Sequence, residues 1–80
     1  MKKDGAEIRR ERMEAISRSI HKNLETQNPL TYTKTVATLA YNTGLTQHRI
    51  EEYLSVLETL SHFIINREKD TISKIVTAED

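Results

Sequence analysis

The chain has 80 residues, which suffices for one hydrophobic core but not for two. Twelve Lys and Arg residues balance twelve Asp and Glu residues, so the formal net charge of zero argues against strong nonspecific attraction to a polyanion. Cysteine is absent, which excludes disulfides, thiolate zinc sites and thiol nucleophiles, and no stretch approaches the roughly 18 apolar residues that cross a bilayer, so we expect a cytoplasmic domain.

A long amphipathic helix is predicted over residues 8–24, because apolar residues recur there at spacings of three and four. The stripe consists of Met13, Ile16, Ile20 and Leu24. Arg9 lies on the same line one turn before this stripe, so we expect the first turns to project beyond the core or to run along a partner. Residues 1–7 are expected to form a flexible basic arm.

The first helical pattern ends at Pro29, since proline lacks a backbone donor and biases the preceding residue away from helix. A short second helix is predicted to open after Thr31 or Thr33, either of which can cap it. It stops before Gly44, a residue suited to the left-handed conformation that closes a helix.

A third helix is predicted over residues 46–60, with Thr46 as its cap. A helical wheel places an apolar set on its inner arc: Ile50, Tyr53, Leu54, Val56, Leu57 and Leu60. The outward set is Gln47, His48, Glu51, Glu52, Ser55, Glu58 and Thr59. This outward set is the candidate reading surface of the chain.

β-Branched residues dominate after His62 and predict a two-stranded hairpin over residues 63–76. Its turn, residues 67–70, contains no glycine, so a four-residue loop is favoured over a two-residue one. Residues 78–80 are expected to fray. The predicted globular domain therefore spans residues 8–77.

The residues around Gly44 have the spacing of a helix-turn-helix. Ala40, a small residue four positions earlier, lets two helices approach each other. Ile50 and Tyr53, six and nine positions later, are expected to lock the two helices at a steep angle.

The run from Thr35 to Leu57, TVATLAYNTGLTQHRIEEYLSVL, resembles winged helix-turn-helix DNA-binding proteins, particularly small archaeal transcriptional regulators. The resemblance extends over about residues 8–77. It implies an α+β, mostly helical fold, the winged helix, in which a three-helix core is followed by a two-stranded wing.

In that family the second helix of the pair lies in the major groove and the wing contacts the flanking backbone or minor groove. The resemblance therefore implies a regulator that binds double-stranded DNA sequence-specifically, with helix 46–60 in the groove and hairpin 63–76 as the wing. At the start of the second helix, Lys34, with Thr33 and Thr35, is expected to hold a phosphate, as helix N-termini do. The candidate DNA-binding residues are Lys34, Thr35, Thr46, Gln47, His48, Arg49, Glu51, Ser55, Arg67, Lys69 and Lys74.

Two features depart from the family's pattern. Thr43 precedes the turn glycine where an apolar residue is usual, which predicts looser local packing. Glu51, Glu52 and Glu58 place three carboxylates on the outward face of the third helix, whereas one carboxylate suffices to accept a hydrogen bond from cytosine N4. Three carboxylates on this face favour weak DNA binding, a strictly defined position of the helix in the groove, or a face that binds another protein. The alternative function is therefore a winged-helix module for protein–protein interaction without direct DNA readout.

No enzymatic, cofactor, metal or small-molecule site is expected. The chain has no glycine-rich phosphate loop and no local Ser/His/Asp signature, and the spacing of His21, His48 and His62 is not that of a chelate. We expect a homodimer, formed through the projecting part of the first helix, because two copies would hold DNA half-sites about 34 Å apart.

Overall fold

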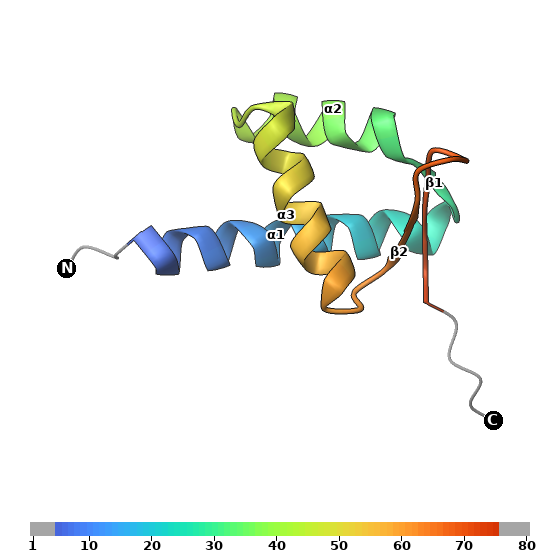
Figure 1. The fold of residues 1–80 in the computed structure, drawn as a ribbon, viewed down its shortest axis with the longest axis horizontal. Helices are drawn as coiled ribbons and strands as arrows, with labels where there is room; N and C mark the ends of the chain where they lie inside the picture. The colour runs from blue at the N-terminus through green and yellow to red at the C-terminus, as the bar shows by residue number, and fades with distance from the viewer. Residues whose placement is uncertain (1–4, 76–80) are drawn as a thin grey trace.

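The computed structural model describes residues 5–75 and has an α+β, mostly helical architecture (Figure 1). Within this range three helices and a three-stranded antiparallel sheet follow one another along the chain. The elements are α1 (Gly5–Thr26), β1 (Leu30–Thr31), α2 (Tyr32–Thr43), α3 (Gln47–Thr59), β2 (Ile64–Asn66) and β3 (Thr71–Ser73). The predicted class is confirmed, and the order of elements is compatible with a winged helix.

The first helix is longer than its apolar stripe. It begins at Gly5, three residues before the predicted start, so residues 5–7 of the expected arm are helical and residues 1–4 lie outside the described range. Every residue from 5 to 12 is exposed, and this half of α1 extends past the other elements (Figure 1), which confirms the expected projection. The other half buries Ile16, Ile20 and Leu24 as predicted.

The sheet contains a strand that the sequence analysis missed. β3 lies in the centre, with β2 on one side and β1 on the other. Leu30 of β1 pairs with Ile72, and Ile65 of β2 pairs with the same residue. The prediction of a two-stranded hairpin was therefore wrong in the number of strands, because a strand of two residues has no period to detect. The four-residue turn at residues 67–70 is confirmed.

The connection between α2 and α3 depends on a left-handed residue. Gly44 has φ 78°, and its N–H donates a 2.9 Å hydrogen bond to the Ala40 carbonyl. Nothing lies within 4 Å of the position that a Cβ would take, so the backbone angle requires glycine here and space does not. Thr43 is held as well, since its hydroxyl donates to the Leu39 carbonyl at 2.7 Å and accepts the Leu45 N–H at 3.2 Å.

The core gathers one face of each helix and the inner face of the sheet. Its fully buried large side chains are Ile20, Ile50, Leu54, Phe63 and Ile72. Two residues assigned to the inner arc of α3 lie outside it: Val56 is 43% exposed and Leu60 is 63% exposed. The prediction was wrong because the apolar arc of α3 is wider than the surface that α1, α2 and the sheet cover.

A residue of the hairpin caps the second helix. Thr31 occupies the N-cap position of α2 but makes no side-chain capping bond. Instead, the Asp70 carboxylate accepts hydrogen bonds from the Thr33 N–H at 3.0 Å and the Thr33 hydroxyl at 2.8 Å. The Asp70 carbonyl also accepts the Tyr32 N–H at 2.8 Å. The expected capping by Thr31 or Thr33 is thus corrected to capping by Asp70, which ties the β2–β3 turn to α2.

Asp70→Gly is expected to lower the free energy of unfolding by about 1 kcal/mol, because it removes a helix cap. Glycine tolerates the positive φ of 57° at this position, so backbone strain does not contribute to the loss. The matched control is Asp70→Asn, which keeps an acceptor oxygen and should retain most of the stability. Urea denaturation followed by circular dichroism measures both; equal stability of Asp70→Gly and the parent chain would contradict the capping role.

No helix among residues 5–75 combines the length and the apolar character needed to cross a membrane.

Candidate nucleic-acid interface

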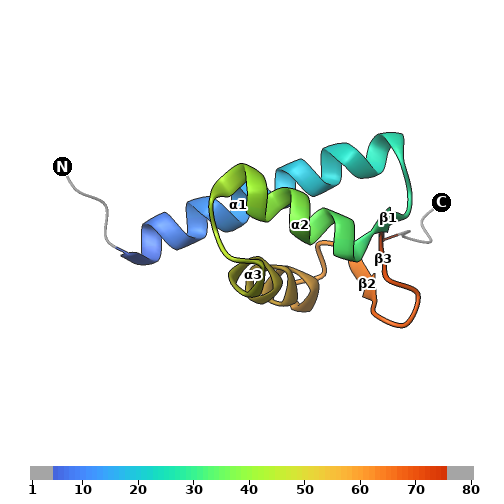
Figure 2. The same cartoon turned by 90° about the horizontal axis from the view of Figure 1, so that it is seen from above.

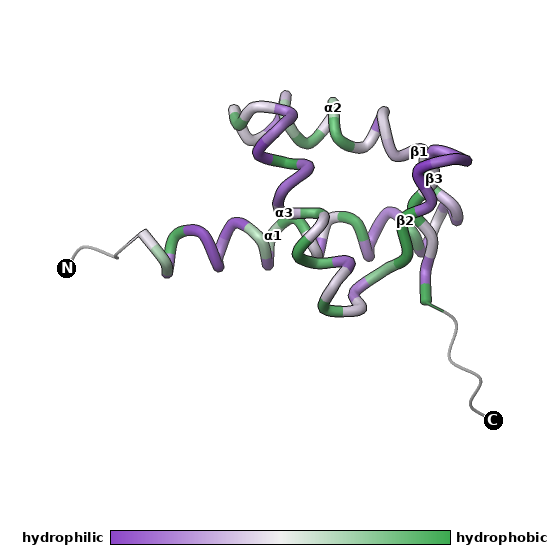
Figure 3. The backbone as a smooth tube through the Cα atoms, in the orientation of Figure 1, coloured by the Kyte–Doolittle hydropathy of each residue, from purple (hydrophilic) through white to green (hydrophobic). Residues whose placement is uncertain are grey.

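The outward face of α3 is open to solvent. Thr46 caps the helix, its hydroxyl accepting the Arg49 N–H at 3.1 Å, as predicted. The residues on this face that are exposed are Gln47, His48, Arg49, Glu51, Glu52 and Ser55. Figure 2 shows α3 and the β2–β3 turn on the same side of the molecule, and Figure 3 shows that the first turns of α3 and this turn are both hydrophilic. We call this combined surface the α3–turn face.

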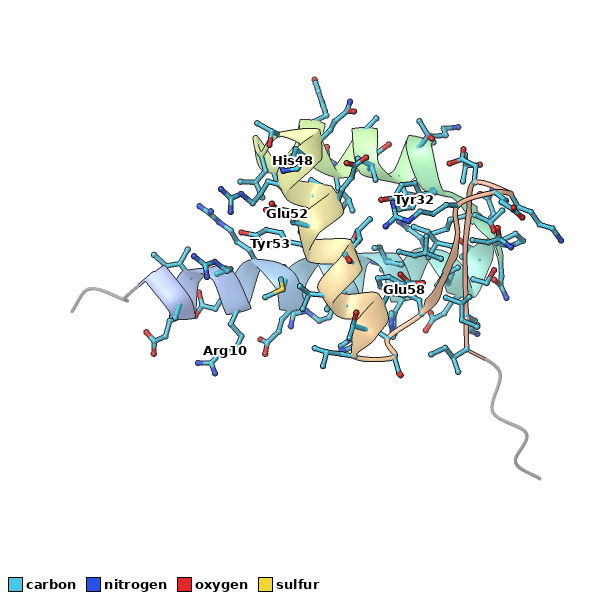
Figure 4. All side chains as sticks on the ribbon, in the orientation of Figure 1. Arg10, Tyr32, His48, Glu52, Tyr53 and Glu58 are labelled. Carbon is cyan, nitrogen blue, oxygen red and sulfur yellow. The ribbon has the colours of Figure 1, made fainter. Side chains whose placement is uncertain are left out.

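The carboxylates of the α3–turn face are unequal. Glu52 lies 3.2 Å from His48 Nε2 and forms an ion pair with Arg49 at 3.6 Å, so its charge is partly neutralised by Arg49 (Figure 4). Glu58 was assigned to the outward set, but it is half-buried and accepts the Ile65 N–H at 3.4 Å. It therefore ties α3 to β2 and does not belong to the reading surface. Among the described residues, Glu51 is the carboxylate of α3 that has neither an ion pair nor a hydrogen bond.

Arg67 anchors the β2–β3 turn to the start of α2, where Tyr32 lies. Its guanidinium carbon lies 5.1 Å from the centre of the Tyr32 ring, within the range of a cation–π contact. Burial raises the pKa of the Tyr32 hydroxyl; the positive charge of Arg67 acts in the opposite direction, and the nearby carboxylate of Glu51 adds to the rise. Arg67 of the turn and Glu51 of α3 therefore both act on the hydroxyl of Tyr32, in opposite directions. Lys69 sits on the same turn with an exposed side chain, and its N–H donates to Asn66 at 3.0 Å.

Lys34 and Thr35 do not join the α3–turn face. Both line a cavity of about 270 Å³ between α1 and α2, together with residues of α1 such as Ser19 and Asn23. The expected phosphate site at the start of α2 is also occupied from within, because the Asp70 carboxylate takes the Thr33 N–H. A phosphate at this helix end would have to displace a carboxylate of the same chain.

Lys74 is likewise placed away from the turn. It follows β3 and lines a second cavity with His21, Leu24 and Glu25 of α1. Its N–H donates to the side-chain oxygen of Asn28 at 3.2 Å. The candidate DNA-binding residues that lie on the β2–β3 turn are therefore Arg67 and Lys69.

Two histidines that are far apart in the sequence meet at the junction of α3 and β2. His21 Nε2 donates to the His62 carbonyl at 2.9 Å, and the two rings lie 6.0 Å apart in an edge-to-face arrangement. His62 Nδ1 and the buried Ser17 hydroxyl share a 2.8 Å hydrogen bond. These bonds anchor the junction to α1. Among residues 5–75, no group of three or more His, Cys, Asp or Glu side chains could hold a metal ion.

Sequence reasoning missed two residues that shape the α3–turn face, Tyr32 and Asp70. Each acts through a partner more than 30 positions away along the chain. The local signals were weak: a tyrosine opening a helix and an aspartate closing a polar turn.

No protein-family model matches the chain, and neither does any curated protein or solved structure.

Proposed function

We propose that the chain is a winged helix domain that binds double-stranded DNA sequence-specifically and acts as a transcriptional regulator. In this proposal α3 enters the major groove and the β2–β3 turn contacts the flanking backbone. The observation that carries it is the pairing of an exposed, polar helix face with a turn that carries the exposed cations Arg67 and Lys69, on one side of the molecule (Figure 2).

The dimensions and side chains of α3 fit a groove reader. An α-helix with its side chains is about 10–12 Å across, and the major groove of B-DNA is about 12 Å wide. Gln47 can bond to both N6 and N7 of adenine, Arg49 to O6 and N7 of guanine, and Glu51 to N4 of cytosine. Glu51 fits the cytosine role because it lacks a partner among the described residues.

A second candidate function is docking on another protein. It is favoured by three exposed apolar side chains: Val56 of α3, Leu60 at the C-cap of α3, and Ile64 of β2, which is 49% exposed. Duplex DNA offers these residues little apolar surface, whereas the core of a protein interface buries such side chains.

Binding to duplexes selected from a random pool, followed by a salt titration, separates the two functions. DNA binding predicts that log affinity falls linearly with log salt, by about 0.9 for each phosphate neutralised. With Arg49, Arg67 and Lys69 as the phosphate and base contacts of one copy, we expect a slope of about −2 to −3 per copy. Absence of duplex binding at low salt would reject the DNA function in favour of protein docking.

Alanine at both Gln47 and His48 is expected to relax sequence preference, because these exposed side chains stand in the first turn of α3. We expect the discrimination between selected and scrambled duplexes to drop by about tenfold or more, which corresponds to one lost bidentate base contact. The control Lys69→Ala should weaken binding to all duplexes about equally, and it should reduce the slope of log affinity against log salt by about one. Unchanged discrimination in the double variant, with its fold intact by circular dichroism, would refute the role of these two residues.

A further inference from the structure

The N-terminal half of α1 is a helix without a cover. Residues 5–12 are all exposed, and the first turns extend past α2, α3 and the sheet (Figure 1). Arg12, at the end of this segment, lines a cavity with residues of α2. Two turns of isolated helix are marginal in water, since helical stability in proteins comes mostly from packing. The one large apolar side chain on these turns is Ile8, which is 38% exposed.

A groove runs between the same helix and α2. Two cavities of about 270 and 200 Å³ adjoin each other at Ser19, Leu39 and Asn42, and we call them together the α1–α2 groove. The apolar residues that line it are the exposed Ala15 and, at its floor, the buried Ile16, Ile20, Leu30 and Leu39. Its two charged side chains are Arg12 toward one end and Lys34 toward the other, and no carboxylate lines it.

The projecting turns and the α1–α2 groove lie on one face of one helix. Ile8, Arg12, Ala15 and Ser19 follow one another at spacings of four, three and four, so they form a single stripe along α1. Ile8 is about 10 Å along the axis from Ala15, at 1.5 Å per residue. Ala15 and Ser19 are small and allow another helix to approach closely. A twofold axis across α1 near Arg12 therefore places Ile8 of each copy over Ala15 and Ser19 of the other, the reciprocal contact that an isologous dimer needs.

We propose that the α1–α2 groove is the docking site for a second copy of this chain, which inserts residues 5–12 of its own α1 in antiparallel orientation. Self-association is favoured over an unrelated peptide because Ile8 lies on the same stripe of α1 as Ala15 and Ser19. One twofold rotation therefore brings Ile8 of each copy onto Ala15 and Ser19 of the other. No residue of α3 lines the groove, so the dimer leaves the α3–turn face open. The proposal does not depend on DNA binding.

Sedimentation equilibrium of the full chain tests the dimer. The parent chain should be dimeric, and Ile8→Glu and Ala15→Lys should each raise the dimer dissociation constant by at least about tenfold, as loss of a central contact does. Both positions are exposed in the isolated subunit, so circular dichroism should show an unchanged fold. Leu60→Glu is the matched control, because it places a charge on an exposed apolar residue just after α3 and should leave the dimer intact. A monomeric parent chain, or a dimer that responds to Leu60→Glu and not to Ile8→Glu, would overturn the proposal.

Cysteine pairing tests the register independently, because the chain has no cysteine of its own. Chains carrying Ile8→Cys and chains carrying Ala15→Cys, mixed and oxidised, should give a disulfide-linked heterodimer. Ile8→Cys mixed with Tyr41→Cys should not, since Tyr41 is exposed on α2 and lies outside the groove lining. Equal yields from the two mixtures would reject the antiparallel register even if the chain dimerises.

Discussion

Replacing Leu54 with alanine is expected to leave the chain largely unfolded at room temperature. Leu54 has no solvent exposure and lies at the centre of the core cluster between α3 and the other elements. Truncating a buried leucine costs about 2–5 kcal/mol through lost transfer energy and the cavity left behind. A single core of this size supplies rarely more than about 3–5 kcal/mol of stability, and no disulfide reinforces it.

The control for Leu54→Ala is the same substitution at Leu60. Leu60 is 63% exposed, so its truncation should change the free energy of unfolding by about 0.5 kcal/mol or less. Urea denaturation, followed by the helical signal in circular dichroism, compares the free energies of unfolding of the two variants directly. Comparable losses from both would show that the core boundary on α3 is drawn in the wrong place.

The helices were predictable because each carries a local period. The stripe of Ile16, Ile20 and Leu24 fixes the buried face of α1 without reference to any other part of the chain. Gly44 predicts the end of α2 because glycine tolerates a left-handed backbone, and Thr46 predicts the start of α3 because its hydroxyl can cap a helix. Both predictions are confirmed. The sequence was therefore sufficient to predict the helices and their ends, because these depend on residues that are close together along the chain.

The missed features all depend on contacts between distant segments. β1 exists because β3 passes beside Leu30 and Thr31, and two residues alone carry no strand signal. The cap of α2 comes from Asp70, 37 positions beyond Thr33, once the hairpin has folded back. A wheel drawn for α3 gives its apolar arc but not how much of that arc the other elements cover, which is why Val56 and Leu60 were assigned to the core.

In the candidate site, too, the features set by local sequence were predictable and those set by distant contacts were not. The exposed face of α3 follows from the wheel, and the structure leaves Gln47, His48 and Ser55 in solvent as expected. Lys34 and Thr35 were assigned from the general affinity of helix N-termini for anions, which takes no account of a carboxylate arriving from the hairpin. Glu58 was assigned to the outward face from sequence, whereas its half-buried carboxylate accepts a hydrogen bond from the backbone of β2.

Ser55→Glu is expected to weaken duplex binding by about 100-fold if α3 reads the major groove. Ser55 is exposed on the outward side of α3, and its side chain makes no hydrogen bond within the described part of the chain. A carboxylate there would stand beside Glu51 and Glu52 and face the DNA phosphates, and an unpaired like-charge contact costs several kcal/mol. A loss of about 3 kcal/mol corresponds to about a 100-fold weaker affinity.

Ser55→Gln separates charge from size in this experiment, because glutamine has the shape of glutamate without its charge. It should weaken binding much less than Ser55→Glu, and the gap between the two variants should narrow as salt concentration rises, since salt screens exposed charges. Fluorescence anisotropy with a selected duplex, measured at two salt concentrations, gives both comparisons. If the glutamate and glutamine variants bind equally well at low salt, α3 does not lie against the phosphates, and the exposed apolar side chains of Val56 and Leu60 then favour a protein as the partner of this helix.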